Sequence, residues 1–290
     1  MIELTYTSSN GTVFNLLSWD GLKTEKANFH KYKWGASVQA ERFGEKIVNF
    51  TKGSQMYEAT FLFRGLPEAR RQMIEDFHFC TEYDIAKQTP GRITWGSDYI
   101  ECYITQSNTA PRDDGGSYTE NTVSIYCPYP FWIEEQTISI FPQDPPQPAR
   151  DTDKGYPQPS TKFSYPYPYS YSPGRNARLV NTRHYDASNF KLVCYGATDS
   201  VEITMGGHLY NVNHAIGLRE YMVIDSRPNV KADKKCYLVN HKGEEINCFN
   251  DRNPSSSLFQ KLPGGTFIIN YNRGYGIVLT LYKERSEPRG

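Results

Sequence analysis

The sequence lacks the features that would point to a membrane or to nucleic acid. No run in its 290 residues approaches the roughly 18 apolar residues that a membrane-spanning helix needs. The 32 Lys and Arg residues balance 32 Asp and Glu residues. Residues 1–141 carry 13 basic and 18 acidic residues, a difference of −5, while residues 179–290 carry 14 and 11. Neither part has the basic excess of a nucleic-acid reader. We therefore expect no membrane insertion and no sequence-specific nucleic-acid binding.

The sequence has no closely spaced cysteine pairs, and we expect no secretion signal. Its six cysteines form no C-x-x-C pair, and Met1–Tyr6 begins directly with alternating strand-like residues. An even count permits disulfides, but nothing indicates the oxidising compartment in which they form. We expect buried free thiols in a protein made in a cytoplasm.

Motifs of catalysis and metal binding are absent or incomplete. Residues 151–155 resemble the start of a calcium loop, but Lys162 stands where that loop needs a bidentate Glu. The sequence has no G-x-S-x-G elbow and no Walker loop. His208 and His214 lie six residues apart without a Cys/His cluster, and a lone strand histidine is usually a satisfied polar residue. The sequence predicts no enzyme, no cofactor and no metal site.

Proline, by contrast, is abundant in one segment. Nine of the eighteen prolines fall between Phe141 and Pro173, in a stretch that ends in alternating Tyr and Pro. Proline fixes φ and removes a backbone donor, which excludes helices and central strands. Residues 142–178 are therefore predicted to form an extended, semi-rigid connector. The connector divides the chain into domains at 1–141 and 179–290.

The first domain reads as strands with one helix. Apolar residues spaced by three and four predict a helix over about 66–84, and Pro67 suits its first turn. Alternating runs such as 56–63 and 121–127 predict strands. Without βαβ alternation, these elements indicate an antiparallel, sandwich-like domain.

The second domain is all-β in character. Short alternating runs are separated by turn signals at intervals near the roughly 8–12 residues typical of a sandwich or barrel. No helical period of useful length interrupts them. The sequence predicts a jelly-roll-like β-sandwich here and a mainly β chain with one helix overall.

Three aromatic residues of the first domain have two readings. Phe29, Tyr32 and Trp34 lie among Lys and His residues with no clean single-face pattern. They belong either to the core or to an arm that packs against another copy, since aromatic anchors dominate interface cores.

The order of several motifs resembles that of siphophage distal tail (Dit) proteins. Tyr126–Trp132 resembles the close of the N-terminal module in that family, and Gly91–Ile93 with Tyr99–Ile104 is similar to the strand pair before it. The Tyr-Pro run at 165–171 is similar to the family's linker. Motifs similar to the family's C-terminal domain are Asn189-Phe190, Tyr195-Gly196, Gly207–Asn213, Glu220-Tyr221, Ile224–Ser226, Leu262–Gly265 and Arg285–Pro288. Their collinear order covers nearly the whole chain.

The resemblance implies a structural protein of the virion tail tip, made in the bacterial host cytoplasm. Dit proteins form a hexameric ring between the tail tube and the adsorption apparatus, with N-terminal domains around a DNA channel and galectin-like C-terminal domains outside. The resemblance implies contacts with the major tail tube protein, a tail-associated lysin or tail spike protein, and a receptor-binding protein. The acidic excess of residues 1–141 fits a channel wall along which DNA slides.

The resemblance also suggests roles for two sets of aromatic residues. Phe29, Tyr32 and Trp34 would lie at the interface between subunits. Because Tyr-Pro alternation presents stiff amphipathic faces, the connector would dock along the C-terminal domain through its tyrosines. These are Tyr165, Tyr167, Tyr169 and Tyr171.

Two alternative functions stay open. A glycan-binding module for host attachment needs an exposed aromatic beside polar groups, and the nearest candidates are His208, Tyr210, Asn211 and Asn213. Larger Dit proteins carry carbohydrate-binding insertions, for which residues 179–290 leave no room. A cell-wall hydrolase is the other alternative, although no motif marks its catalytic residues.

Overall fold

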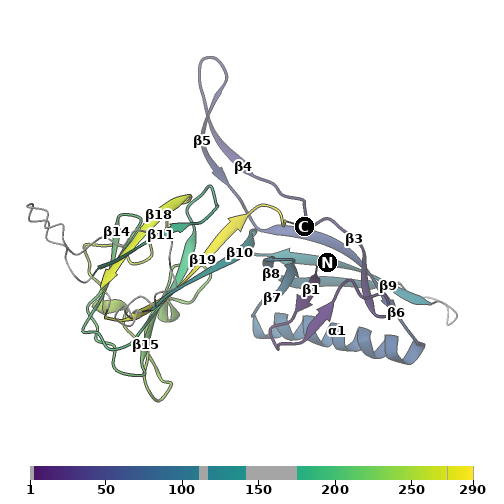
Figure 1. The fold of residues 1–290 in the computed structure, drawn as a ribbon. Coiled ribbons are helices and arrows are strands. Elements are labelled where there is room, and N and C mark those ends of the chain that lie inside the picture. The colour runs from purple at the N-terminus through teal and green to yellow at the C-terminus, as the bar shows by residue number, and fades with distance from the viewer. Residues whose placement is uncertain (1–2, 111–116, 142–174, 273, 290) are drawn as a thin grey trace, which may run out of the picture. The chain divides into compact units, whose positions relative to one another are not determined.

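The chain folds into two compact units. The computed structural model describes residues 3–110, 117–141, 175–272 and 274–289. The first unit comprises Met1–Glu135 and Lys283–Gly290, and the second comprises Gln136–Tyr282. Both consist mostly of β-strands, and within the described residues the first unit holds the one α-helix (Figure 1). The prediction of a mainly β chain with one α-helix is confirmed.

The sheet of the first unit is organised around its longest strand, β8. The N-terminal part of β8 pairs with β7, from which the ladder continues to β1 and β2. The C-terminal part of β8 pairs with β9, from which the ladder continues to β6 and β3. The strands of this sheet are β1 (Leu4–Thr7), β2 (Val13–Asn15), β3 (Leu22–Ala27), β6 (Gln55–Arg64), β7 (Gly91–Trp95), β8 (Asp98–Thr109) and β9 (Tyr118–Cys127). Strands β4 (Gly35–Ala40) and β5 (Glu45–Thr51) form a separate sheet, and β10 (Trp132–Ile140) begins in the first unit and ends in the second.

Helix α1 (Pro67–Lys87) begins at the predicted proline and ends three residues beyond the predicted limit of 84. Its C-cap is Gln88, whose φ of 51° is left-handed and stops the helix. Phe77 is fully buried and meets the rings of Tyr6, Phe14, Phe61 and Phe63 at centroid distances of 5.9, 5.4, 5.9 and 5.6 Å. These edge-on contacts fix the helix on the sheet.

A buried carboxylate joins the end of α1 to the first strand. Asp84 is 0% exposed, and its Oδ2 accepts a 2.5 Å hydrogen bond from the Tyr6 hydroxyl. Its Oδ1 accepts from Ser8 Oγ at 2.7 Å, Ser9 N at 2.8 Å and Ser9 Oγ at 2.6 Å. Burial, and then the bond to Asp84, raise the pKa of Tyr6 far above its ordinary value. Gly91 packs directly on this pair, because a Cβ there would lie 2.5 Å from Asp84 Oδ2. The glycine of the Gly91–Ile93 motif is thereby explained.

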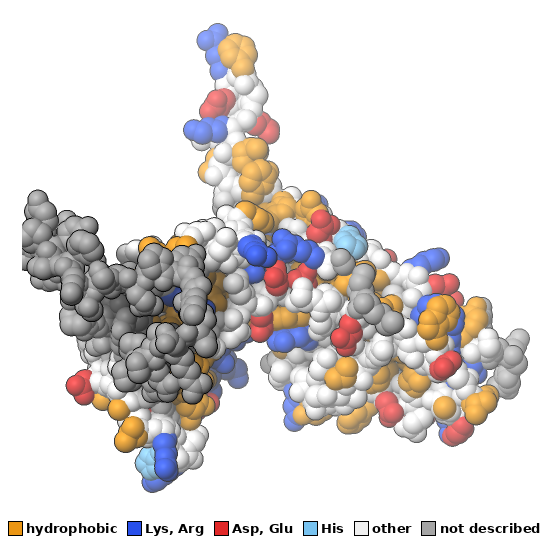
Figure 2. Space-filling model, viewed as in Figure 1, with side chains coloured by type: hydrophobic (Ala, Val, Ile, Leu, Met, Phe, Trp, Pro, Cys, Tyr) orange, Lys and Arg blue, Asp and Glu red, His pale blue; other side chains and the backbone are white. Residues whose placement is uncertain are grey.

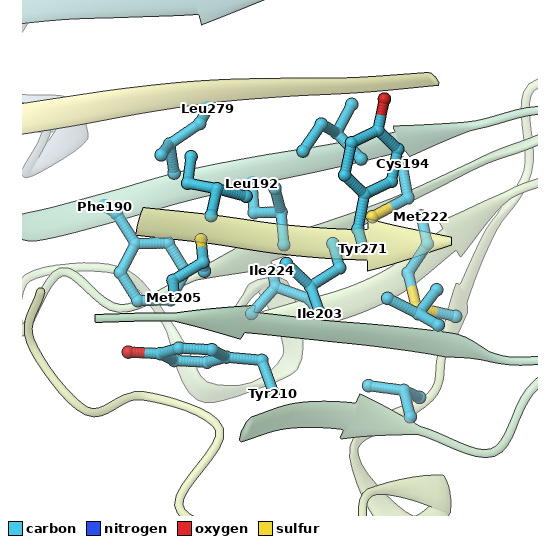
Figure 3. Packing of buried hydrophobic residues seen from close by; sticks show 14 of the residues in the cluster. Phe190, Leu192, Cys194, Ile203, Met205, Tyr210, Met222, Ile224, Tyr271 and Leu279 are labelled. Carbon is cyan, nitrogen blue, oxygen red and sulfur yellow. The ribbon is translucent and has the colours of Figure 1, made fainter. Parts of the chain in front are cut away.

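The second unit is a sandwich of two sheets, with strand orders β17-β16-β15-β12-β19 and β11-β18-β13-β14. Its core lies between them (Figure 3): Phe190, Leu192 and Met222 from the first sheet face Ile203, Tyr210 and Tyr271 from the second. The strands are β11 (Arg175–Asn181), β12 (Asn189–Tyr195), β13 (Val201–Met205), β14 (His208–Val212), β15 (Tyr221–Asp225), β16 (Cys236–Val239), β17 (Glu245–Asn247), β18 (Thr266–Asn272) and β19 (Gly276–Arg285). Two 3-10 turns, η1 (Ala232–Lys234) and η2 (Phe249–Asp251), lie between strands.

The unit boundaries differ from the predicted ones at two places. Strand β11 begins at Arg175, so the last four residues of the predicted connector, 142–178, form strand. The final residues, 283–290, belong to the first unit rather than to the domain predicted over 179–290. Connector residues 142–174 lie outside the described residues.

Buried ion pairs hold the C-terminal residues in the first unit. Glu134 accepts from Lys283 Nζ at 3.2 Å and from Arg285 Nη2 at 2.5 Å. The backbone N–H of Arg289 donates to Asp98 Oδ2 at 2.6 Å. Local sequence patterns carry no trace of such long-range pairs, which is why the boundary was misplaced.

All six cysteines are free and buried, as predicted. Among the described residues, no helix combines the length and apolar character required to cross a membrane.

Candidate functional site

The most conspicuous surface feature is the hairpin formed by β4 and β5, which projects away from the sheet and helix of its unit (Figure 1). Within the described part of the chain, these two strands pair only with each other. Every residue of both strands is exposed to solvent. A two-stranded hairpin without a covering layer is marginally stable in water. The hairpin therefore has the properties of an arm that another molecule covers.

One face of the hairpin is apolar. Cross-strand pairs share a face, and two successive pairs on one side are Ala36 with Phe50 and Val38 with Ile47. The exposed fractions of Val38, Ile47 and Phe50 are 47%, 54% and 54%. We call Ala36, Val38, Ile47 and Phe50 the apolar face of the hairpin. Figure 2 shows hydrophobic side chains along this projection.

The opposite face of the hairpin is polar, with Ser37 paired to Asn49 and Gln39 paired to Lys46. A register shift between Ser37 and Val38 lets the two faces stay separate along the hairpin. Strand residues that alternate in this way normally bury their apolar side. Among the described residues no other strand pairs with the hairpin, and Val38, Ile47 and Phe50 stay about half exposed.

The base of the hairpin holds an aromatic cluster around one lysine. Lys52 Nζ lies 5.9, 5.6 and 4.4 Å from the ring centroids of Tyr32, Trp34 and Phe131. Trp34 Nε1 donates to Ser286 Oγ at 3.3 Å, so the C-terminal residues also reach this cluster. Lys52 Nζ is inaccessible to solvent and has no hydrogen-bond partner in the described part of the chain. Burial lowers the pKa of Lys52 to about 8.

The lowered pKa predicts a specific pH dependence of stability. Between about pH 8 and the ordinary Lys value of 10.5, the unfolded chain binds a proton that folded Lys52 has lost. The free energy of unfolding should therefore rise with pH relative to Lys52→Met, in which this group is absent and the tyrosines and thiols still titrate. Urea unfolding of both proteins from about pH 7.5 to about pH 10 measures the difference. If the free energy of unfolding of the wild type minus that of Lys52→Met stayed constant or fell as the pH rises, the lowered pKa of buried Lys52 would be contradicted.

The three aromatics singled out in the sequence divide between core and surface. Phe29 is fully buried and meets the rings of Tyr57, Trp95 and Trp132 at 5.8, 5.8 and 5.9 Å. Of the two alternatives that the sequence allowed, core or arm, Phe29 therefore lies in the core. Tyr32 and Trp34 are 50% and 41% exposed at the hairpin base.

Sequence reasoning missed the apolar face of the hairpin itself. Two features of the sequence could have indicated it: apolar and polar residues alternate at positions 36–39, and apolar residues stand at positions 47 and 50, beyond the turn at Gly44. The connector tyrosines Tyr165, Tyr167, Tyr169 and Tyr171 lie outside the described residues.

The candidate glycan residues do not form an aromatic platform. Tyr210 is fully buried, with its ring 5.2 Å from that of Phe190 and its hydroxyl donating to the carbonyl of Gln260 at 2.8 Å. His208 Nε2 lies 2.7 Å from the carbonyl oxygen of Ser257. The backbone N–H of Asn213 donates to the carbonyl of Asp251 in η2, and the carbonyl of Asn211 accepts from the backbone N–H of Asn253 just after it. Sugar stacking needs an exposed ring, which Tyr210 does not offer.

A trio in the first unit superficially resembles a hydrolase triad. His78 Nε2 lies 3.1 Å from Ser107 Oγ and 3.3 Å from Asn121 Nδ2. In a triad the third residue binds the other ring nitrogen and orients the base. Here both partners share Nε2, so the trio lacks the arrangement that activates a serine.

The fold is that of proteins from the tail ends of phages. Among solved structures, this chain is similar to the Dit protein of phage SPP1, described as a paradigm of the hub adsorption apparatus in phages that infect Gram-positive bacteria. The TM-score is 0.60 at 12% identity, covering 97% of this chain and 99% of that one. It is also similar to a chain of the phage p2 baseplate, solved in its activated conformation with Ca and with Sr. There the TM-score is 0.62 at 9% identity in both cases, covering 99% of this chain and 100% of that one. No family model and no curated protein matches the sequence.

Proposed function

We propose that this protein is a Dit-like structural component of a phage tail tip or baseplate, without enzymatic activity. The observation that carries the proposal is the fold match over 97% of this chain and 99% of the SPP1 hub protein. It agrees with the collinear motifs of the sequence, which span both units. The virion tail is the corresponding location.

The hairpin supports assembly into a closed ring. An arm on one copy and the surface that receives it on the next are different patches, and such head-to-tail contacts close into rings when the rotation allows. The uncovered apolar face would provide the contact, with Tyr32 and Trp34 at its base. By the family resemblance, the ring contains six copies.

The acidic excess of residues 1–141 supports a place beside DNA. The first unit, residues 1–135 with 283–290, carries 16 basic and 20 acidic side chains, so it can face a polyanion without retaining it. In this proposal the first unit lines the channel and the second lies outside. The partners are the major tail tube protein on one side, and a tail-associated lysin or tail spike protein and a receptor-binding protein on the other.

Negative-stain images of the purified protein test the proposal. The expected particles are rings with sixfold symmetry and peripheral lobes. Single small particles without a central hole, at micromolar concentration, would contradict it.

A further inference from the structure

The second unit contains a cluster of three metal-ligating side chains that plays no part in the proposed ring. His214, Cys248 and Asp251 each offer one ligand atom, and these atoms all lie within 4.8 Å of one another. His214 Nδ1 and Asp251 Oδ2 are 2.8 Å apart. His214 follows β14, while Cys248 immediately precedes the η2 turn and Asp251 is its last residue. An imidazole, a thiol and a carboxylate from two separate segments therefore converge.

Backbone hydrogen bonds hold these segments together independently of the three side chains. Asn213 N donates to the carbonyl of Asp251 at 2.8 Å, and Asn253 N donates to the carbonyl of Asn211 at 3.1 Å. A β-bridge between Val212 and Arg252 lies beside them. The positions of the donors are thus set by the main chain, which is the condition for a preorganised site.

Main-chain hydrogen bonds also fix Cys248 relative to Asp251 within the η2 turn. Cys248 N donates to the carbonyl of Cys236 at 3.0 Å, and Asp251 N donates to the carbonyl of Cys248 at 3.1 Å. Cys248 is fully buried, whereas the side chains of His214 and Asp251 are 31% and 42% exposed. The cluster is closed on the core side and open to solvent on the other.

The chemical types of the three ligand atoms favour some metals over others. Calcium and magnesium take oxygen ligands, while a thiolate combined with imidazole favours zinc. Zinc sites with three protein ligands complete a tetrahedron with water, and the exposed side of this cluster leaves room for one. We propose that His214, Cys248 and Asp251 bind one Zn²⁺ ion, which fastens η2 to the end of β14. On binding, the Cys248 thiol proton, now directed to the carbonyl of Ile246 at 3.3 Å, passes to the buffer, while the ring proton of neutral His214 resides on the ring nitrogen that does not bind the metal.

Co²⁺ is the probe for the test, because it replaces zinc and gives a thiolate charge-transfer absorption in the near ultraviolet. The untagged full chain, freed of metal with a chelator, should develop this band with one equivalent of Co²⁺ and lose it on addition of Zn²⁺. His214→Ala should weaken Co²⁺ binding by about 100-fold or more, given that even outer-shell changes cost 10–100-fold. Cys248→Ser should remove the charge-transfer band.

His208→Ala is the matched control, since His208 lies in the same unit outside the cluster, and it should bind as the wild type does. His214→Ala removes a side chain that is 31% exposed, so a circular dichroism spectrum equal to that of the wild type separates lost ligation from lost folding. No binding of Co²⁺ or Zn²⁺ by the wild type at a concentration of about 100 µM, or a band that survives Cys248→Ser, would overturn the proposal. In that case the cluster is an ion pair beside a core thiol.

Discussion

Replacing Val38, Ile47 and Phe50 together with serine should convert the assembled protein to folded monomers. All three side chains are about half exposed and contribute to neither core cluster of the chain. Their removal therefore costs little folding stability. In the ring their exposed halves would be covered, and each would contribute about 0.8–1.5 kcal/mol to association, half of what full burial gives. Three such losses correspond to an affinity for the neighbouring copy roughly 50- to 2,000-fold weaker. Sedimentation velocity measures the shift, and circular dichroism measures the fold.

The polar side of the same hairpin supplies the matched control. The double substitution Gln39→Ala and Asn49→Ala changes side chains that belong to the same two strands but lie on the opposite face of the hairpin. This variant should assemble as the wild type does. An assembly that survives the three serine substitutions, or one that the control abolishes equally, would remove the apolar face from the interface.

Asp84→Ala should lower the free energy of unfolding of the first unit by about 3–5 kcal/mol. The substitution removes an acceptor of four hydrogen bonds in a site with 0% exposure. The Tyr6 hydroxyl and Ser8 Oγ would stay buried without it, and each buried donor left unsatisfied costs about 1–3 kcal/mol. Urea unfolding of the two proteins gives the difference.

Asp76→Ala on the same helix is the control for Asp84→Ala. Asp76 accepts an exposed hydrogen bond from Gln72 at 2.9 Å, so its removal should change stability by no more than about 0.5 kcal/mol. If Asp84→Ala also changed stability by less than about 1 kcal/mol, the buried network would not anchor the helix.

Local patterns in the sequence were sufficient for the elements that local chemistry determines. Pro67 marked the first turn of α1, and the alternation of the second unit predicted its two-sheet sandwich. The same patterns could not show which side of a strand is buried. Tyr210 looked like a surface aromatic beside Asn211, yet it points into the core against Phe190.

Features that depend on contacts between residues far apart in the chain could not be predicted from the sequence. The pairing of Glu134 with Lys283 and Arg285 returns the C-terminal residues to the first unit across about 150 positions. The cluster of His214 with Cys248 and Asp251 is likewise assembled by folding, and the sequence alone predicted no metal site. The hairpin was missed for a different reason. Its alternation can be recognised in the sequence, but only the structure shows that both strands stay exposed among the described residues.

The molar mass of the wild-type protein in solution tests the central claim most directly. Multi-angle light scattering during size-exclusion chromatography, at micromolar concentration, should give a mass near six times the 33.3 kDa of one chain. A single species of 33.3 kDa across the concentration range would contradict a ring built through the β4–β5 hairpin.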